Sequence, residues 1–243
     1  MGKPRAVVLD VDGTLVRLRG SLGELYSEAL LSCGVRLSPE TLHNATLKTW
    51  GGFEEQYLHS EGDYATSSAR EVLLWNEFVR RSLQECGAGL EHRHDLLAAV
   101  YSFFSMGRSR CIMSGAVEAC RSLSEAGVRV IAATNNDLRT KQVLHDLGFS
   151  PFVDLVVTAG ELGWKKPSPK FFRKLAEVAE LPIGEMLHVG NSRRLDVDAA
   201  REGGMRALLF DPDGEDSDDT ISDLRVLAGI CGCTSTGAKS PQI

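Results

Sequence analysis

The sequence has few residues of the kinds that define several large classes of protein. Lysine and arginine together number 27 against 33 aspartates and glutamates, which gives a formal net charge of -6. Nucleic-acid-binding domains are usually basic, so any phosphate binding here has to be local. No stretch approaches the roughly 18 consecutive apolar residues of a membrane span. We therefore expect neither a nucleic-acid nor a membrane partner.

The N-terminus and the cysteines carry no sign of export. The first residues lack the charged and then apolar layout of a secretory signal peptide. Ala6 stands where a myristoylation signal requires serine or threonine. The six cysteines have no framework spacing, so we expect free thiols in a reducing compartment. These features together favour a cytoplasmic protein.

Five short apolar runs have the continuous character of strands that are buried on both faces of a sheet. Segments of helical length lie between the later runs, and the alternation of strand and helix from about residue 113 to residue 210 predicts a doubly wound parallel α/β sheet. The expected strands are residues 6–9, 128–133, 152–157, 186–189 and 207–210, and the expected helices are 115–126, 137–147, 169–179 and 196–202.

A stretch of about a hundred residues separates the first expected strand from the others. It shows no convincing strand, and Ser38-Pro39 has the form of a helix start. Trp75 belongs to an apolar stripe at helical spacing, which we interpret as bundle core rather than as a ligand site. We therefore assign residues 17–112 to a helical domain inserted into an α/β core of residues 1–16 and 113–230.

The composition changes after Phe210. An acidic linker over residues 211–219 is followed by a candidate helix around residues 221–227. The polar, low-complexity end of the chain, residues 231–243, is expected to be a disordered tail.

Two aspartates follow the first expected strand. Asp10 and Asp12 are two positions apart, and alternate side chains of an extended backbone point the same way. Carboxylates held that close repel each other, and Mg²⁺ commonly relieves the repulsion because it prefers oxygen ligands. Taken alone, however, Asp-x-Asp-Gly-Thr is equally consistent with an ordinary turn.

Polar residues also follow three of the other expected strands, and ligands of open α/β sheets bind at the carboxyl ends of the strands. Each of these residues alone could cap a helix or carry a solvated charge. Together they predict a single phosphate site. They are Thr134-Asn135-Asn136 at the start of a helix, Lys165-Lys166, and Gly190-Asn191-Ser192 followed by Asp196.

This ordered set resembles the haloacid dehalogenase superfamily, whose members share a Rossmann-like core. The helical insertion is similar to the helical cap of that family, and the resemblance covers about residues 5–227. Trp164 and the stretch 15–19 resemble, more narrowly, the haloacid dehalogenase-like hydrolase domain-containing protein 3 group. The four matching motifs are Asp10-x-Asp12-x-Thr14, Thr134-Asn135, Lys166-Pro167-Ser168-Pro169, and Gly190-Asn191-Ser192 to Asp196.

Resemblance to the phosphatase branch implies a Mg²⁺-dependent phosphatase that acts on a small phosphorylated metabolite. Asp10 would form an aspartyl-phosphate, and Asp12 would serve as general acid and base. Lys166 would hold transferring oxygens together with Thr134, and it would also fix Asp10. Thr14 and Asn135 complete the implied phosphate contacts.

The resemblance also implies a Mg²⁺ site formed by Asp10, Asp12, Asn191 and Asp196. The fourth motif of the family normally opens with an aspartate, whereas this chain has Asn191 there. The amide oxygen can still coordinate Mg²⁺, but the site loses one negative charge, so weaker metal affinity is expected.

Two alternatives to the phosphatase remain open. A 2-haloacid dehalogenase would need the Asp10 nucleophile but no metal, and Asp12 argues against it. A binding or regulatory protein could keep the fold while its metal site decays. Substrate contacts are possible from Arg17, Arg19, Arg193 and Arg194, and none of the six histidines is a good catalytic candidate.

Overall fold

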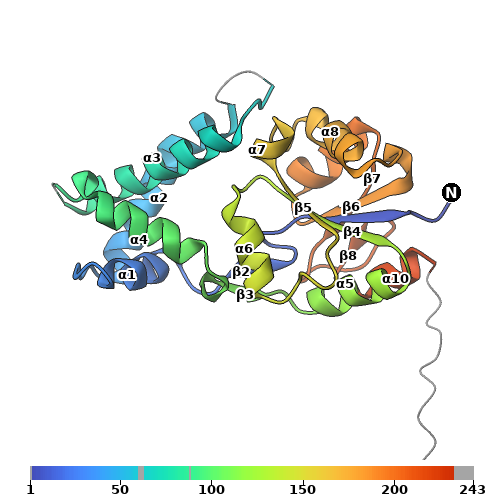
Figure 1. Cartoon of the computed structure of the whole chain (residues 1–243), viewed down its shortest axis with the longest axis horizontal. Helices are drawn as coiled ribbons and strands as arrows, with labels where there is room; N and C mark the ends of the chain where they lie inside the picture. Colours follow the sequence, from blue (N-terminus) through green and yellow to red (C-terminus); the bar gives the residue numbers. More distant parts are fainter. Residues whose placement is uncertain (1, 60–62, 88, 233–243) are drawn as a thin grey trace, which may run out of the picture.

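The structure, a computed structural model, describes residues 2–59, 63–87 and 89–232, without the side chains of residues 54–59 (Figure 1). Apart from its first two residues, the predicted disordered tail at 231–243 lies outside the described residues. No helix in the described part of the chain is long and apolar enough to cross a membrane.

A parallel sheet of six strands forms the core, in the order β5-β4-β1-β6-β7-β8. The predicted α/β fold is confirmed, and the five predicted strands are all present within a few residues of their expected bounds. The strands are β1 Ala6–Leu9, β4 Arg129–Thr134, β5 Leu155–Thr158, β6 Met186–Gly190, β7 Arg206–Phe210 and β8 Thr220–Ile221. β1 lies in the middle and pairs with both β4 and β6.

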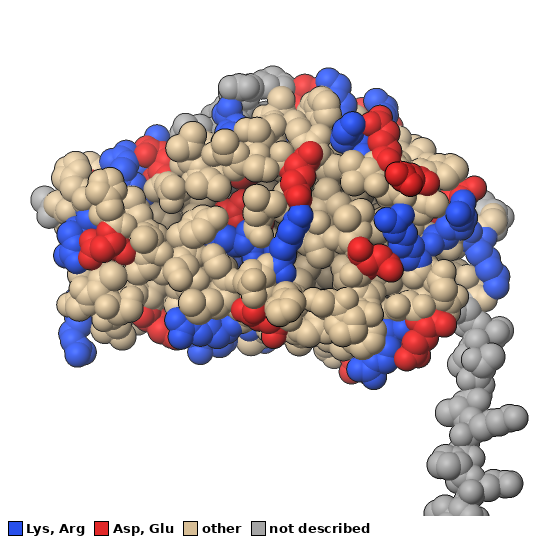
Figure 2. All heavy atoms as spheres, in the orientation of Figure 1, with Lys and Arg blue, Asp and Glu red and all other residues tan. Residues whose placement is uncertain are grey.

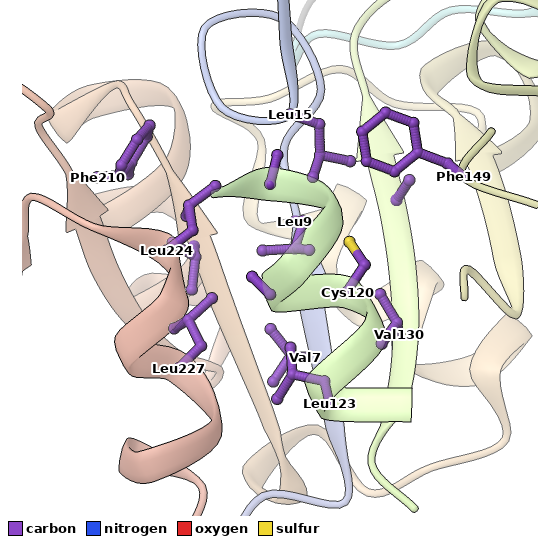
Figure 3. Close-up of a cluster of buried hydrophobic side chains, with 14 of the residues drawn as sticks. Val7, Leu9, Leu15, Cys120, Leu123, Val130, Phe149, Phe210, Leu224 and Leu227 are labelled. Carbon is purple, nitrogen blue, oxygen red and sulfur yellow. The ribbon is translucent and has the colours of Figure 1, made fainter. Parts of the chain in front are cut away.

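Helices cover both faces of this sheet. Successive side chains of β1 enter opposite layers: Val7 and Leu9 pack on one side, Ala6 and Val8 on the other. Burial on both faces explains why the strand is apolar throughout. Figure 3 shows Val7 and Leu9 against Cys120 and Leu123 of the helix α5. The core helices are α5 Ala116–Glu125, α6 Arg139–Asp146, α7 Ala159–Leu162, α8 Pro169–Ala179, α9 Ala199–Gly203 and α10 Leu227–Ile230.

Four helices form the insertion, which lies to one side of the core in Figure 1. They are α1 Leu22–Leu31, α2 Pro39–His59, α3 Ser68–Cys86 and α4 His94–Phe104. Their buried apolar residues make a hydrophobic cluster separate from the two layers of the sheet. Ser21 and Glu24 form a capping box at the start of α1. α2 begins at Pro39, as the sequence predicts.

The prediction that the insertion and its borders lack strands is wrong. β2 Val16–Leu18 and β3 Arg110–Ile112 form an antiparallel pair where the chain leaves and re-enters the core. Strands of three residues are too short to show a recognisable alternation of apolar and polar side chains. The domain boundaries at 16/17 and 112/113 stay a prediction.

Two further expectations need correction. The helix expected around residues 221–227 begins with β8 instead, and only a 3-10 turn at Leu224–Val226 and the short α10 follow. The helix expected over residues 196–202 starts earlier, as a π-helical stretch at Arg193–Asp198 that leads into α9. π-Helical turns occur often at functional sites because they re-aim side chains.

Candidate functional site

Asp10 lies at the carboxyl end of the central strand. It follows β1 directly, and its backbone N–H donates to the carbonyl of Val189 in β6 over 2.9 Å. Asp10 is only 7% exposed to solvent. The Nζ of Lys166 donates to Asp10 Oδ1 over 2.5 Å and to Asp196 Oδ1 over 2.6 Å. One buried ammonium thus joins two carboxylates from different strand ends.

Burial and charge act against each other in this cluster. Burial raises the pKa of Asp10 to about 7, although the Lys166 ammonium lowers it. Burial would lower the pKa of Lys166, but Asp10 and Asp196 outweigh it and hold that pKa above its usual range. Burial would raise the pKa of Asp196, and here Lys166 and His188 prevail and hold it low. Lys166 is therefore a permanent cation between the two acids.

Asp196 is occupied by protein donors at both of its oxygens. The Oδ1 atom accepts from Lys166 and from His188 Nε2, the latter over 3.0 Å, and the Oδ2 atom accepts from the backbone N–H of Ser192 over 3.0 Å. Burial lowers the pKa of His188, so a neutral ring donates the Nε2 proton. The predicted metal ligand Asp196 thus orients Lys166 in this structure.

Asp12 has different neighbours. Its Oδ1 accepts from Arg110 Nε over 3.2 Å, and its Oδ2 accepts from the side-chain amide of Asn136. The Asp12 side chain is 38% exposed, whereas that of Arg110 is 13% exposed. Arg110 belongs to β3, where the chain returns from the insertion. No pattern in the sequence points to Arg110, because it is separated from Asp12 by 98 positions.

The predicted phosphate contacts gather at the same edge of the sheet. Thr14 is fully buried, with its Oγ1 3.5 Å from Asp10 Oδ2. The Oγ1 of Thr134 accepts from the backbone N–H of Asn136. The side chain of Asn135 brackets Lys166: its Nδ2 donates to the Lys166 carbonyl over 2.8 Å, and its Oδ1 accepts from the Lys166 N–H over 2.7 Å. Asn135 therefore fixes the loop that carries the lysine.

Asn191 stands against the turn that follows the first aspartate. Gly13 has a φ of +87°, and a Cβ atom there would lie 2.2 Å from Asn191 Nδ2. Glycine is thus required at position 13 both by its backbone conformation and by the close approach of Asn191. This contact brings the amide of the fourth motif next to the Asp10–Asp12 loop.

A cavity of about 380 Å³ connects these side chains. The core contributes a polar floor, and the insertion contributes Trp50, Phe53 and Trp75. The interpretation of the Trp75 stripe as bundle core is therefore incomplete. Trp75 packs against the apolar cluster of the insertion and also lines the cavity. The floor residues are Asp10, Asp12, Thr134, Asn135, Asn136, Lys166, Asn191, Ser192, Arg194, Leu195 and Asp196.

Of the four arginines proposed for substrate contact, the cavity lining includes only Arg194. Arg19 pairs with Glu28 of α1, and Arg193 pairs with Asp219 over 2.6 Å. Arg17 lies exposed on β2. Figure 2 shows basic and acidic side chains interspersed over one face of the molecule. The basic side chains that line the cavity are Lys166 and Arg194.

The predicted Mg²⁺ ligands supply oxygen atoms, which suit a hard cation. Asp10, Asp12 and Asn191 all line the cavity, and one oxygen of Asp10 accepts nothing from Lys166. Among the described residues, no three His, Cys, Asp or Glu side chains meet in a way that could hold a metal ion. The oxygen atoms of Asp10, Asp12 and the Asn191 amide suit Mg²⁺ in their chemistry, and their role as ligands stays a prediction.

This fold and the strand-end site define the class of protein. The model of the haloacid dehalogenase-like hydrolase family matches residues 4–204, and the chain belongs to this family of hydrolases. That the helical insertion between β2 and β3 is the helical cap of this family stays a prediction.

Named relatives share this fold along most of the chain. The human haloacid dehalogenase-like hydrolase domain-containing protein 3 is 27% identical over 84% of this chain and 81% of its own length. Ribulose-1,5-bisphosphate 5-phosphatase of Halopiger xanaduensis is 28% identical over 89% of this chain and 88% of its own. Among solved structures, the magnesium-bound HAD hydrolase YfnB of Bacillus subtilis superposes with a TM-score of 0.75, at 17% identity over 95% and 99% of the two chains.

Proposed function

We propose that this hydrolase is a Mg²⁺-dependent phosphatase that acts on a small phosphorylated metabolite. The observation that carries the proposal is the buried cluster of Asp10, Lys166 and Asp196 at the carboxyl end of β1, with Asp12 beside it in the cavity. A carboxylate fixed by an ammonium can attack a phosphorus atom, and a second, more exposed carboxylate can exchange protons with the leaving group and with water.

In the first step, an oxygen of Asp10 attacks phosphorus and the bond from phosphorus to the ester oxygen breaks. Asp12 in its acid form gives its proton to the departing oxygen, which leaves as an alcohol. The product is an aspartyl-phosphate on Asp10. Lys166 and Thr134 hold the oxygens of the phosphoryl group as it transfers.

In the second step, Asp12 takes a proton from a water molecule, which attacks the phosphorus of the aspartyl-phosphate. The bond from phosphorus to Asp10 breaks, inorganic phosphate leaves, and Asp10 is a carboxylate again. Arg110 and Asn136 keep Asp12 in one place for both proton transfers.

Asp10 and Asn191 would hold the Mg²⁺ ion through side-chain oxygens, and Asp12 would add its backbone carbonyl oxygen, because its carboxylate is needed for proton transfer. When bound, the ion would shield the carboxylates from the phosphate and offset charge on the transferring oxygens. A direct role of Asp196 as ligand stays a prediction, and its three protein donors favour the role of orienting Lys166.

The test is hydrolysis of para-nitrophenyl phosphate and acetyl phosphate with Mg²⁺ and with a chelator. We expect turnover with Mg²⁺ and its loss on chelation, with recovery when Mg²⁺ is restored. Turnover that is unchanged by the chelator would refute the metal-dependent mechanism.

A catalytically inactive binding protein is the second candidate, and Asn191 is the observation that favours it, because it lowers the negative charge available to the metal. If the pure protein neither binds Mg²⁺ in calorimetry nor hydrolyses any ester of a metabolite panel, this candidate replaces the phosphatase. Chloride release from a 2-chloroacid would instead favour the dehalogenase.

A further inference from the structure

The side of the cavity that the insertion forms, called the wall below, consists of one kind of side chain. Every described side chain of the insertion that lines the cavity is aromatic: Trp50 and Phe53 come from α2, and Trp75 comes from α3. The charged and hydrogen-bonding groups of the cavity come from the core. A phosphate at the floor would thus point its ester group towards aromatic rings.

The rings are held in place by their neighbours. The Trp75 ring lies 5.5 Å from Phe78 and 5.9 Å from Phe104, and the guanidinium of Arg139 sits 4.5 Å from its centroid. The Trp50 ring packs edge to face on Phe78 at 5.8 Å. Side chains fixed in this way lose little freedom when a ligand stacks on them, so the wall is preorganised.

Trp50 also keeps accessible surface in this arrangement. The residue is 37% exposed although its ring packs against Phe78. The cavity of about 380 Å³ falls in the range of small-molecule sites, which start at roughly 300 Å³. A six-membered ring linked to a phosphate therefore has space between the Trp50 ring and the floor.

Trp75 offers a further contact. Its indole Nε1 is buried and has no hydrogen-bond partner in the described part of the chain. Because this atom has almost no accessible surface, Trp75 would contact a ligand through its ring rather than through its N–H.

We propose that the substrates are phosphate monoesters whose leaving alcohol carries a planar aromatic ring, and that Trp50 and Trp75 determine this specificity. The inference rests on the proposed phosphatase function for turnover but not for binding. Ring stacking favours the planar ligand over a saturated one of equal size, which predicts a preference of about fivefold to tenfold.

The test compares benzyl phosphate with cyclohexylmethyl phosphate, whose leaving alcohols have similar size and reactivity. We expect a kcat/KM about fivefold to tenfold higher for benzyl phosphate, and Trp50→Leu and Trp75→Leu should each reduce that ratio towards one. Acetyl phosphate, which has no ring, gives the rate of the parent protein on a ring-free substrate. Leu73→Ala is the matched control, because Leu73 also lies on α3 but is 68% exposed.

Calorimetry with benzylphosphonate and cyclohexylmethylphosphonate separates this inference from the phosphatase itself, since neither compound is hydrolysed. Tighter binding of the benzyl compound by about fivefold or more supports the aromatic wall even if no ester is turned over. Equal affinity, or a preference that survives both Trp→Leu variants, would overturn the inference. If the parent protein does not hydrolyse acetyl phosphate, that result counts against the proposed phosphatase activity but not against the aromatic wall.

Discussion

The two sides of the cavity are built in different ways. On the floor, Asp10, Lys166 and Asp196 are buried, hydrogen bonded and balanced in charge by one another. On the wall, Trp50 and Trp75 are held by ring contacts and contribute apolar surface. The floor thus carries features that a reaction at phosphorus needs, whereas the wall can only sort ligands by shape. Substitutions on the floor should therefore lower the rate of hydrolysis, whereas substitutions on the wall should change the preference between substrates.

The largest expected effect is on the floor. Asp10→Asn removes the nucleophile, and we expect kcat to fall by about four orders of magnitude or more. Lys166 keeps Asp196 as its partner, so the fold should persist. Hydrolysis assays and circular dichroism of the same preparation check both points. Folded protein with more than about a tenth of the parent rate would exclude Asp10 as the nucleophile.

Lys166→Met should be the most damaging change to stability. It leaves Asp10 and Asp196 buried without their shared cation, and we expect the free energy of unfolding to fall by about 3–5 kcal/mol. Urea denaturation measures the change. Lys170→Met is the matched control, because the ion pair of Lys170 with Asp63 is half exposed and should contribute less than about 1 kcal/mol. Similar losses in both variants would contradict the electrostatic account of the floor.

An intermediate loss in the free energy of unfolding is expected at the contact between the insertion and the core. Glu71 of α3 pairs with Lys165 over 3.0 Å, and the side chains are 3% and 1% exposed. Glu71→Leu removes the acid that pairs with the buried Lys165 ammonium, and we expect a loss of about 3 kcal/mol. Glu77→Leu, on the same helix but in more exposed ion pairs, should cost less than about 1 kcal/mol.

The pH dependence of that loss gives a second check. Burial lowers the pKa of Lys165 to about 8, with Glu71 opposing the shift. Without Glu71 the folded-state pKa of Lys165 falls further below that of the unfolded chain. The folded variant therefore loses this proton at a lower pH than the folded parent protein does. Its deficit in unfolding free energy should therefore be smaller near pH 9 than near pH 7. A deficit that grows with pH would rule out the lost pairing of the Lys165 ammonium as its cause.

The smallest expected effect concerns the metal. Asn191→Asp adds an acid to the donor set, and we expect Mg²⁺ to bind about tenfold more tightly because of the added charge. Calorimetric titration with Mg²⁺ alone measures this without any substrate. An unchanged affinity would remove Asn191 from the metal's ligands.

The position of the floor could be predicted from the sequence because the strand topology determines which residues meet there. Carboxyl ends of adjacent parallel strands meet at one edge, so Asp10, Thr134 and Asn191 converge once the strands are recognised. Asn135 and Asp196 also line this cavity, and their side chains hold Lys166.

The wall could not be predicted in the same way. Helical periodicity identifies the apolar face of α3, but Trp75 lies at the edge of that face and serves both the cluster and the cavity. Which edge residue reaches a site depends on how the helices pack. Arg110 and its contact with Asp12 depend on strands of three residues, which leave no pattern in the sequence.

The central claim is that phosphate passes through a covalent bond to Asp10. Its most direct test is to quench the protein during turnover of acetyl phosphate with Mg²⁺, reduce acyl phosphates with borohydride, and map the peptides by mass spectrometry. The account predicts that position 10 is reduced to homoserine, and that omission of substrate prevents the change. Turnover that leaves Asp10 unmodified, or that modifies Asp12 instead, would contradict it.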